Sequence, residues 1–168
     1  MPKINRPPFD KYPLVSNERI TLRQPVESDL NDLMEISFYN AVQATTLEQA
    51  VEMNQKINQD YNNGNSIHWT IVEKQSGKLV GTCGYYRGFK NGQGELGCIL
   101  LPHYRGMGFM TAAMQLAIQF GKSNMNLKRI WAVTDLQNKK AIQLLQRLDF
   151  KKIKTRDDTH VEFELNQV

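Results

Sequence analysis

The stretch from Glu95 to Lys122 constrains this chain more than any other, because it joins an apolar run, a short glycine-rich loop and an amphipathic segment. Residues 96–101, Leu-Gly-Cys-Ile-Leu-Leu, have the length and composition of a strand buried on both faces, and Pro102 is expected to end it. From Phe109 onward the apolar residues recur at helical spacing, and the polar residues fall in a narrow stripe. The sequence therefore predicts a buried strand, a turn and a mostly buried helix.

The loop between this strand and this helix, residues 103–108, contains two glycines and one arginine. Glycine lets backbone N–H groups come close to an anion, and the dipole of the following helix favours negative charge at its N-terminus. We therefore expect the loop to bind phosphate groups.

Two other phosphate-binding designs fit the sequence poorly. A P-loop needs Lys followed by Ser or Thr at the helix start, where this chain has Phe, Met and Thr at residues 109–111. Residues 92–97 match the dinucleotide pattern G-x-G-x-x-G, but the match precedes a strand instead of following one, and Asn91 with Gly92 is typical of a hairpin turn. Nucleotide hydrolysis and dinucleotide binding are therefore disfavoured.

Residues 105–110, Arg-Gly-Met-Gly-Phe-Met, resemble the R/Q-x-x-G-x-G/A signature of the GNAT acetyltransferases, with Met110 in place of the last small residue. The surrounding residues 95–106 look most like the RimJ/RimL branch, whose members acetylate protein N-termini and other primary amines. Residues 138–150 are similar to the family's second landmark, an Asn that opens a helix ending in a Leu-x-Phe pair. The resemblance runs from the first expected strand to the C-terminus.

This resemblance implies the mixed α/β GNAT fold, a central twisted, mostly antiparallel sheet of about seven strands with one splayed parallel pair, flanked by about four helices. The local patterns fit it, since the segment from residue 96 to residue 133 forms a βαβ unit whose strands run parallel. Helices are expected after Ser28-Asp29, after a capping box at Thr45-x-x-Glu48, and over residues 138–148. Other strands are expected at residues 18–23, 67–72, 79–86, 150–154 and 160–165.

A chain of 168 residues has the size of one domain, so residues 14–168 are expected to form a single N-acetyltransferase (GNAT) domain. Residues 1–13 are expected to form a loosely held N-terminal arm. They have no apolar run, so the arm reads as neither a signal peptide nor a membrane span, and we expect a cytoplasmic protein without a membrane partner.

The net charge of +4 and the pI of about 9.1 suit an anionic cofactor as well as nucleic acid. The basic run at residues 151–156 lacks interleaved aromatic residues, so no nucleic-acid partner is expected. Cys83 and Cys98 lie in expected strands and are interpreted as small buried hydrophobes in a reducing compartment. The three histidines are far apart in the sequence, so no metal site is predicted.

The family resemblance implies acetyl-CoA as co-substrate, with no metal. Backbone N–H groups from Arg105 to Met110 are expected to hold its pyrophosphate, with Arg105 fixing the loop; the alternative is a turn that only joins strand to helix. Asn138 is implied to reach the pantetheine, or to act as a helix N-cap, or both. The expected cofactor-binding residues are Ile99, Leu100, Leu101, Arg105, Gly106, Met107, Gly108, Phe109, Met110 and Asn138.

Glu95 enters the central strand, and the resemblance implies a catalytic role near the acceptor amine. An ammonium must lose a proton to a base before it can attack a thioester. The alternative is a solvated acid at a strand end. Trp69, Tyr85 and Tyr86 could line an acceptor pocket or belong to the core.

The leading hypothesis is direct acetyl transfer to a primary amine without an acyl-enzyme, because neither cysteine has an evident activating partner. The acceptor classes implied are a protein N-terminus, a polyamine, an amino acid or an aminoglycoside, and a homodimer is a family-level expectation. The alternative function is a catalytically weak or inactive CoA-binding regulatory protein, and a nucleic-acid-binding module ranks third.

The second landmark departs from the family pattern at Ala141. Relatives commonly have a Ser at this position, or a Tyr further along the helix, that protonates the departing CoA thiolate. Here residues 141–148 contain no hydroxyl. We expect either a bound water in its place or weak catalysis.

Overall fold

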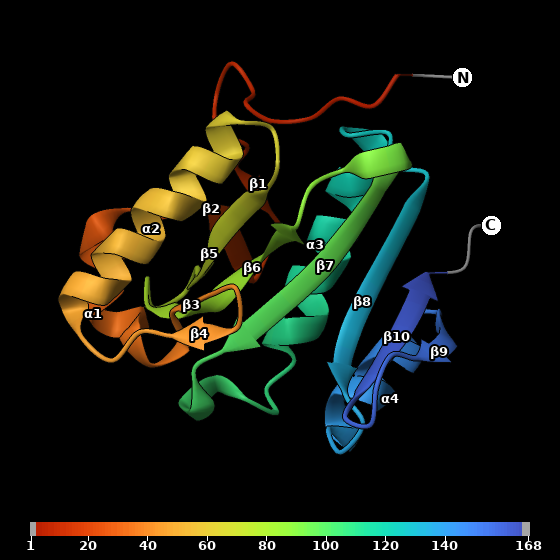
Figure 1. Ribbon diagram of the computed structural model, residues 1–168. Coiled ribbons are helices and arrows are strands. Elements are labelled where there is room, and N and C mark those ends of the chain that lie inside the picture. The colour runs from red at the N-terminus through yellow and green to blue at the C-terminus, as the bar shows by residue number, and fades with distance from the viewer. Residues whose placement is uncertain (1–2, 166–168) are drawn as a thin grey trace.

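An eight-stranded sheet of order β1-β2-β5-β6-β7-β8-β10-β9 forms the centre of the computed structural model, which describes residues 3–165 (Figure 1). The first five of these strands in space are antiparallel neighbours, and β7 and β8 form the parallel pair. The strands are β1 Val15–Ser16, β2 Ile20–Arg23, β5 Ile67–Glu73, β6 Leu79–Tyr86, β7 Gln93–Leu100, β8 Arg129–Asp135, β9 Phe150–Thr155 and β10 His160–Leu165.

The described residues contain four α-helices, as the sequence predicts: α1 Leu30–Leu33, α2 Leu47–Asn62, α3 Phe109–Ser123 and α4 Lys139–Arg147. Helix α3 packs on one face of the sheet against β6 and β7, and α1 and α2 lie on the opposite face (Figure 1). The mixed α/β architecture with one parallel pair is therefore confirmed. Two short strands, β3 Phe38–Tyr39 and β4 Val42–Gln43, form a separate hairpin that the sequence analysis did not predict.

Two boundaries differ from the sequence prediction. Helix α2 starts one residue later than the expected capping box, because the Thr46 side chain accepts the Gln49 N–H while Gln49 accepts from the Thr45 N–H. Strand β7 starts at Gln93, before the apolar run. Its glycines are required for packing: a Cβ at Gly97 would lie 2.4 Å from the Tyr86 ring.

The core lies mainly between α3 and the sheet. Trp69 and Phe120 meet edge to face with ring centres 5.3 Å apart, and the buried Tyr85 hydroxyl donates to the Ala117 carbonyl at 2.7 Å. Trp69 and Tyr85 are therefore core residues, whereas Tyr86 points to the other face of the sheet.

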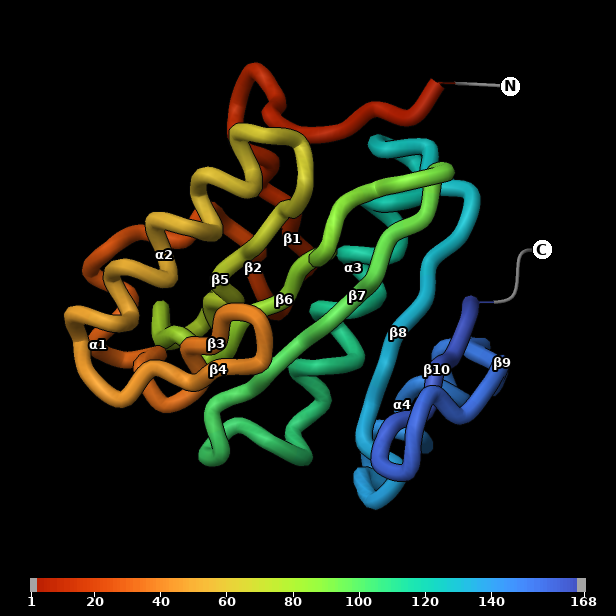
Figure 2. Tube along the Cα trace, viewed as in Figure 1, coloured from red at the N-terminus to blue at the C-terminus, as the bar shows by residue number. Residues whose placement is uncertain are grey.

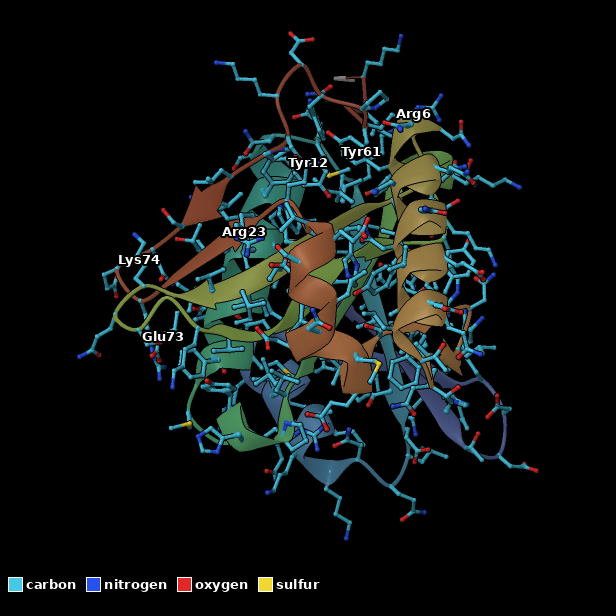
Figure 3. The ribbon with its side chains drawn as sticks, turned by 90° about the vertical axis from the view of Figure 1, so that its left-hand side faces the viewer. Arg6, Tyr12, Arg23, Tyr61, Glu73 and Lys74 are labelled. Carbon is cyan, nitrogen blue, oxygen red and sulfur yellow. The ribbon has the colours of Figure 1, made fainter. Side chains whose placement is uncertain are left out.

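The N-terminal arm is not loosely held over its described residues. The Phe9 ring packs against Phe120. The Tyr12 ring stacks on Tyr61 with centres 4.5 Å apart (Figure 3). The Tyr12 hydroxyl also donates to the His68 carbonyl and accepts the His68 N–H. These aromatic contacts were not evident because the arm is otherwise basic and rich in proline.

Among the described helices, none has both the length and the apolar character needed to cross a membrane.

Candidate active site

Strands β7 and β8 separate soon after they meet. Their parallel pairing is confined to residues 93–95 of β7 and 129–131 of β8 (Figure 2). The Leu101 N–H bonds the Val80 carbonyl on β6, and in an antiparallel pair the direction of the backbone groups alternates. The N–H and C=O groups of Cys98 and Leu100 consequently point toward β8 where the two strands have already diverged, whereas Leu96 still faces Trp131 at the end of the parallel pairing. The structure thus leaves a free edge of peptide groups along one side of a gap.

At the end of this edge lies the loop before α3. Gly106 and Gly108 have φ angles of 75° and 84°, the left-handed conformation that favours glycine. The first helical hydrogen bond of α3 runs from Ala112 N–H to Gly108 O at 3.2 Å, and within residues 3–165 no acceptor is found for the N–H groups of residues 106–111. These N–H groups lie at the positive end of a helix of 15 residues, an arrangement that favours an anion.

Arg19 adds a cation to this loop that the sequence analysis missed. Its guanidinium carbon lies 4.1 Å from the centre of the Phe109 ring, and a Cβ on Gly108 would come within 2.9 Å of its Nη1. In the part of the chain that the structure describes, Arg19 has no acidic partner within 4.0 Å. Since 86 residues of sequence separate Arg19 from Arg105, no local motif could have linked them.

The expected cofactor residues occupy different places around the gap. Leu100 presents its backbone to the gap, whereas Ile99 turns its side chain toward a cavity on the other face of the sheet. Leu101 packs with Leu33 and Ile36, and its N–H is already bonded to β6. Residues 105–110 form the loop and the first turn of α3, with the Phe109 side chain buried and the Met107 side chain 51% exposed.

Asn138 is the N-cap of α4, on the β8 side of the gap. Its Oδ1 accepts the Ala141 N–H at 3.1 Å, so the capping interpretation is confirmed. No hydrogen bond of its Nδ2 is found among residues 3–165, which leaves that donor available to a ligand.

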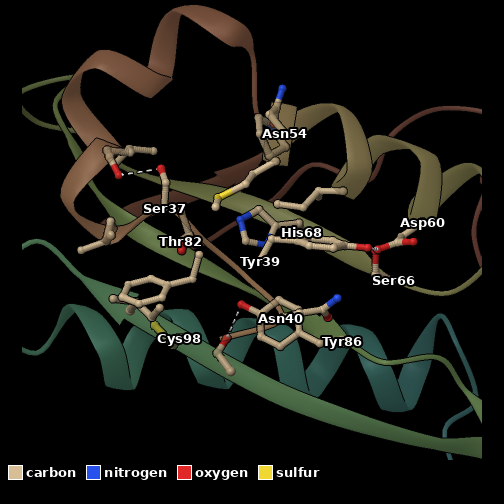
Figure 4. A pocket seen from close by; sticks show the side chains of 18 of the residues that line it. Ser37, Tyr39, Asn40, Asn54, Asp60, Ser66, His68, Thr82, Tyr86 and Cys98 are labelled. Atoms are coloured by element: carbon tan, nitrogen blue, oxygen red, sulfur yellow. Dashed lines mark hydrogen bonds between the residues drawn. The ribbon is translucent and has the colours of Figure 1, made fainter. Parts of the chain in front are cut away.

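A cavity of about 670 Å³ lies on the sheet face that carries α1 and α2 (Figure 4). Because side chains alternate along a strand, neighbouring strands contribute rows of residues to its floor. In one row Tyr86 is paired with Glu95. The next row contains His68, Gly84 and Gly97, and the third contains Thr70, Thr82 and Ile99. Val133 of β8 also lines the cavity, which therefore reaches the gap between β7 and β8.

Glu95 occupies the point where the two halves of the site meet. It is directly opposite Trp131 in the last register of the parallel pair, just before the strands part. Only 6% of the residue is exposed; its Oε1 forms an ion pair with Arg87, and its Oε2 has no hydrogen-bond partner among the described residues. The solvated-acid alternative is therefore wrong, because this carboxylate is buried and one of its oxygens lacks a donor among the described residues.

Two other titratable groups lie on the cavity floor. Burial lowers the pKa of His68 to about 4, so its imidazole is neutral at physiological pH. Although burial by itself raises the pKa of Asp29, hydrogen bonds from Arg23 and from the Val26 N–H bring that pKa below its usual value. Arg23 binds Asp29 through two nitrogens, both at 2.8 Å, so this carboxylate is fully paired.

The β3–β4 hairpin covers the cavity from the side of α2. Its Tyr39 hydroxyl donates to Asp60 Oδ2 on α2 at 2.9 Å, which raises the pKa of Tyr39 (Figure 4). The turn residues Asn40 and Ala41 both have positive φ, at 48° and 64°. The sequence analysis missed this hairpin because neither turn residue is glycine.

Comparisons with known proteins agree with this geometry. Residues 19–151 match the family described as "Acetyltransferase (GNAT) domain". The chain is 32% identical over 143 residues to the uncharacterized N-acetyltransferase p20 of Bacillus licheniformis, a match that covers 80% of each chain. A shorter match, 36% identical over 56 residues, covers 33% of this chain and 30% of the spermidine N(1)-acetyltransferase of Escherichia coli.

Two solved structures share the fold. A putative ribosomal-protein-serine acetyltransferase from Vibrio cholerae superimposes with a TM-score of 0.80 at 18% identity, covering 92% of this chain and 97% of that one. A dodecameric spermidine N-acetyltransferase from the same organism gives a TM-score of 0.72 at 16% identity, covering 89% and 94%. At such identities the likeness concerns the fold alone.

Proposed function

The chain belongs to the GNAT acetyltransferase family, and from that premise we propose that it transfers the acetyl group of acetyl-CoA directly to a primary amine. The observation that carries this proposal is the continuity of the site. A row of free backbone N–H groups, a free strand edge and a cavity with a buried carboxylate adjoin one another around the gap between β7 and β8.

The donor half of the site consists mainly of backbone groups. The N–H groups of residues 106–111 and the cation of Arg19 would bind the pyrophosphate of acetyl-CoA. The free edge at Cys98 and Leu100 would pair with the pantetheine amides, and the free Nδ2 of Asn138 would donate to them across the gap. Residues 105–110 are the main part of the proposed pyrophosphate site, with Met110 in place of the usual small residue.

Glu95 is proposed as the base. The amine nitrogen attacks the thioester carbonyl, the carbon–sulfur bond breaks, and the amine proton goes to the free oxygen of Glu95. Arg87 holds the other oxygen and so orients the carboxylate. Helix α4 carries no hydroxyl near Ala141, and CoA is proposed to leave as a thiolate, which a thiol pKa of about 8.5 permits.

The cavity favours a small-molecule amine over a protein N-terminus as the acceptor. Its volume of about 670 Å³ is typical of a small-molecule site, and the β3–β4 hairpin covers it. Polyamine, amino-acid and aminoglycoside amines remain candidates, and the relatives include spermidine acetyltransferases. Three further proposals rest on the family alone: membership of the RimJ/RimL-like branch, a cytoplasmic location and a homodimer. Light scattering tests the homodimer.

The second candidate function is a CoA-binding protein with weak or no turnover, which the missing hydroxyl on α4 favours. Calorimetry with acetyl-CoA, followed by free-thiol detection over a panel of primary amines, separates the two. Binding with amine-dependent thiol release supports the enzyme, and binding without release supports the second function. No binding at high micromolar protein contradicts both.

A further inference from the structure

Two buried polar atoms lack hydrogen-bond partners among residues 3–165, Ser66 Oγ and Glu95 Oε2. Both residues line the same cavity, and they are 7% and 6% exposed. A buried polar atom without a partner is unfavourable, so each of them favours a ligand that supplies one. The proposed chemistry uses Glu95 but leaves Ser66 unexplained.

The strand register separates these two atoms across the cavity floor. Ile67 is paired with Tyr85, which places Ser66 opposite Tyr86, and Tyr86 is paired with Glu95. Ser66 and Glu95 therefore lie in one row, two strands apart, at a backbone separation of about 10 Å. The Tyr86 ring does not fill the space between them, because it lies against Gly97 and Gly84 in the neighbouring row.

Next to Ser66 lies a carboxylate without a cation. The Asn65 N–H bonds the Asp60 carbonyl at 2.8 Å, which holds the end of α2 beside the start of β5, and Figure 4 shows Asp60 and Ser66 on the same side of the pocket. The neutral Tyr39 hydroxyl is the donor found for the Asp60 carboxylate. In the described chain no Lys or Arg comes within 4.0 Å of it, and Lys56 instead lies 5.6 Å from the centre of the Tyr39 ring.

The three carboxylates of the cavity therefore differ in what they can bind. Asp29 is fully paired with Arg23, and Glu95 forms an ion pair with Arg87 through one of its oxygens. Asp60 has no ion pair within 4.0 Å among the described residues, and the unpaired Ser66 hydroxyl beside it can accept a further hydrogen bond. A charge-assisted donor, such as an ammonium group, satisfies both residues at once.

We propose that Asp60 and Ser66 form a second subsite, which binds an ammonium group at the far end of the acceptor while the reacting amine lies at Glu95. The inference rests on the proposed function, and it makes a diamine a better acceptor than a monoamine of the same length. Asp60 and Ser66 then determine specificity and take no part in the chemistry.

The test compares hexamethylenediamine with hexylamine, which has the same carbon chain but no second ammonium. Thiol release from acetyl-CoA should give a KM for the diamine at least tenfold below that for the monoamine. In Asp60→Asn the diamine KM should rise about tenfold, with kcat and the hexylamine KM little changed. Ser66→Ala should shift the diamine KM in the same direction by a smaller factor. Glu52→Gln, an exposed carboxylate elsewhere on α2, is the matched control and should change neither.

Equal KM values for the two amines in the wild type, or an equal effect of Asp60→Asn on both, would overturn the subsite and leave the proposed function intact. If neither amine is acetylated, calorimetry of each amine with the CoA-bound protein decides: tighter diamine binding that Asp60→Asn removes supports the subsite, and equal or absent binding overturns it. Failure to bind acetyl-CoA counts against the proposed function instead.

Discussion

The donor half and the acceptor half of this site are built in opposite ways. The donor half, from Leu96 to the first turn of α3, is nearly continuous in sequence and offers mostly backbone N–H and C=O groups. The acceptor half brings together α1, α2, the β3–β4 hairpin and the strands β5, β6, β7 and β8, and it offers side chains. A backbone site needs glycines and a helix start at fixed spacing, so it leaves a motif, whereas a side-chain site needs only that distant residues meet in space.

This difference has a consequence for mutations. Substitutions in the donor half should act mainly through backbone conformation and should change the affinity for acetyl-CoA. Substitutions in the acceptor half should act through side-chain chemistry and should change kcat or the KM for the amine. Glu95, at the junction, is the residue expected to leave acetyl-CoA binding intact while removing turnover.

The largest effect is expected for Glu95→Gln. Loss of a general base typically costs 10²–10⁴ in rate, so kcat should fall at least about 100-fold while the dissociation constant of acetyl-CoA stays within about twofold. Steady-state kinetics with calorimetry checks both values. A kcat within about tenfold of wild type would remove Glu95 from the chemistry, and Ala141→Ser would then test whether protonation of the thiolate limits the rate.

A smaller effect, in the donor half, is expected for Gly106→Ala. The added methyl would project from the loop that approaches the pyrophosphate, so affinity for acetyl-CoA should fall about tenfold or more. Gly77→Ala is the matched control, because both glycines have similar positive φ angles, 75° and 71°, and a Cβ at either meets nothing within 4 Å. Both variants should lose about 1–2 kcal/mol of stability, and only Gly106→Ala should lose affinity. Equal acetyl-CoA affinity in the two would contradict the loop assignment.

Arg19→Met should weaken acetyl-CoA binding about fivefold and leave the amine KM unchanged. Methionine keeps apolar contact with Phe109 but removes the charge beside the loop. The loss should shrink at high salt, as expected for a partly exposed charge interaction. Lys78→Met, an exposed cation in the turn between β5 and β6, serves as the control. If the two variants bind acetyl-CoA equally well, Arg19 only packs against Phe109.

The smallest effect concerns His68 and pH. The pKa of His68 is about 4 in the folded state and 6.5 in the reference state, so the unfolded chain binds more protons between those values. The contribution of the buried, neutral His68 to the free energy of unfolding should therefore be present above pH 6.5 and be lost as the pH falls toward 4. From pH 7 to pH 6 the free energy of unfolding should fall by about 0.7 kcal/mol because of His68. Urea unfolding of the wild type and of His68→Gln at pH 7 and pH 6 isolates the contribution of His68. An identical pH dependence of unfolding in the two proteins would contradict the low pKa assigned to His68.

The sequence predicts the donor half well because its information is local. Gly106, Gly108 and the helix start lie within a few residues, and the apolar pattern of α3 is regular. The same reasoning missed the start of β7, since Gly94 follows the expected turn at Asn91 and Gly92 and looks like a turn residue until the Tyr85 ring is seen packed against it. Glycine marks close packing as often as it marks a turn, and only the neighbouring strand distinguishes the two uses.

The acceptor half could not be predicted from sequence beyond Glu95 and the suggestion that Tyr86 could line it. Asp60 lies on α2 and Ser66 just before β5, and each looks ordinary for a surface helix and a strand start. Their significance depends on the register that sets Ser66 in line with Glu95, and on the finding that no described Lys or Arg lies within 4.0 Å of Asp60. Arg19 and the aromatic contacts of residues 3–13 were missed for the same reason, because their partners are distant in sequence.

The most direct test of the account is a titration of the protein with acetyl-CoA followed by backbone amide chemical shifts. We predict that the largest changes occur at residues 106–111 and at Cys98 and Leu100, with residues 60–66 responding only when an amine is added. Saturable acetyl-CoA binding that leaves the amides of residues 106–111 unchanged would contradict the central claim that this chain holds its donor through the backbone of the loop before α3.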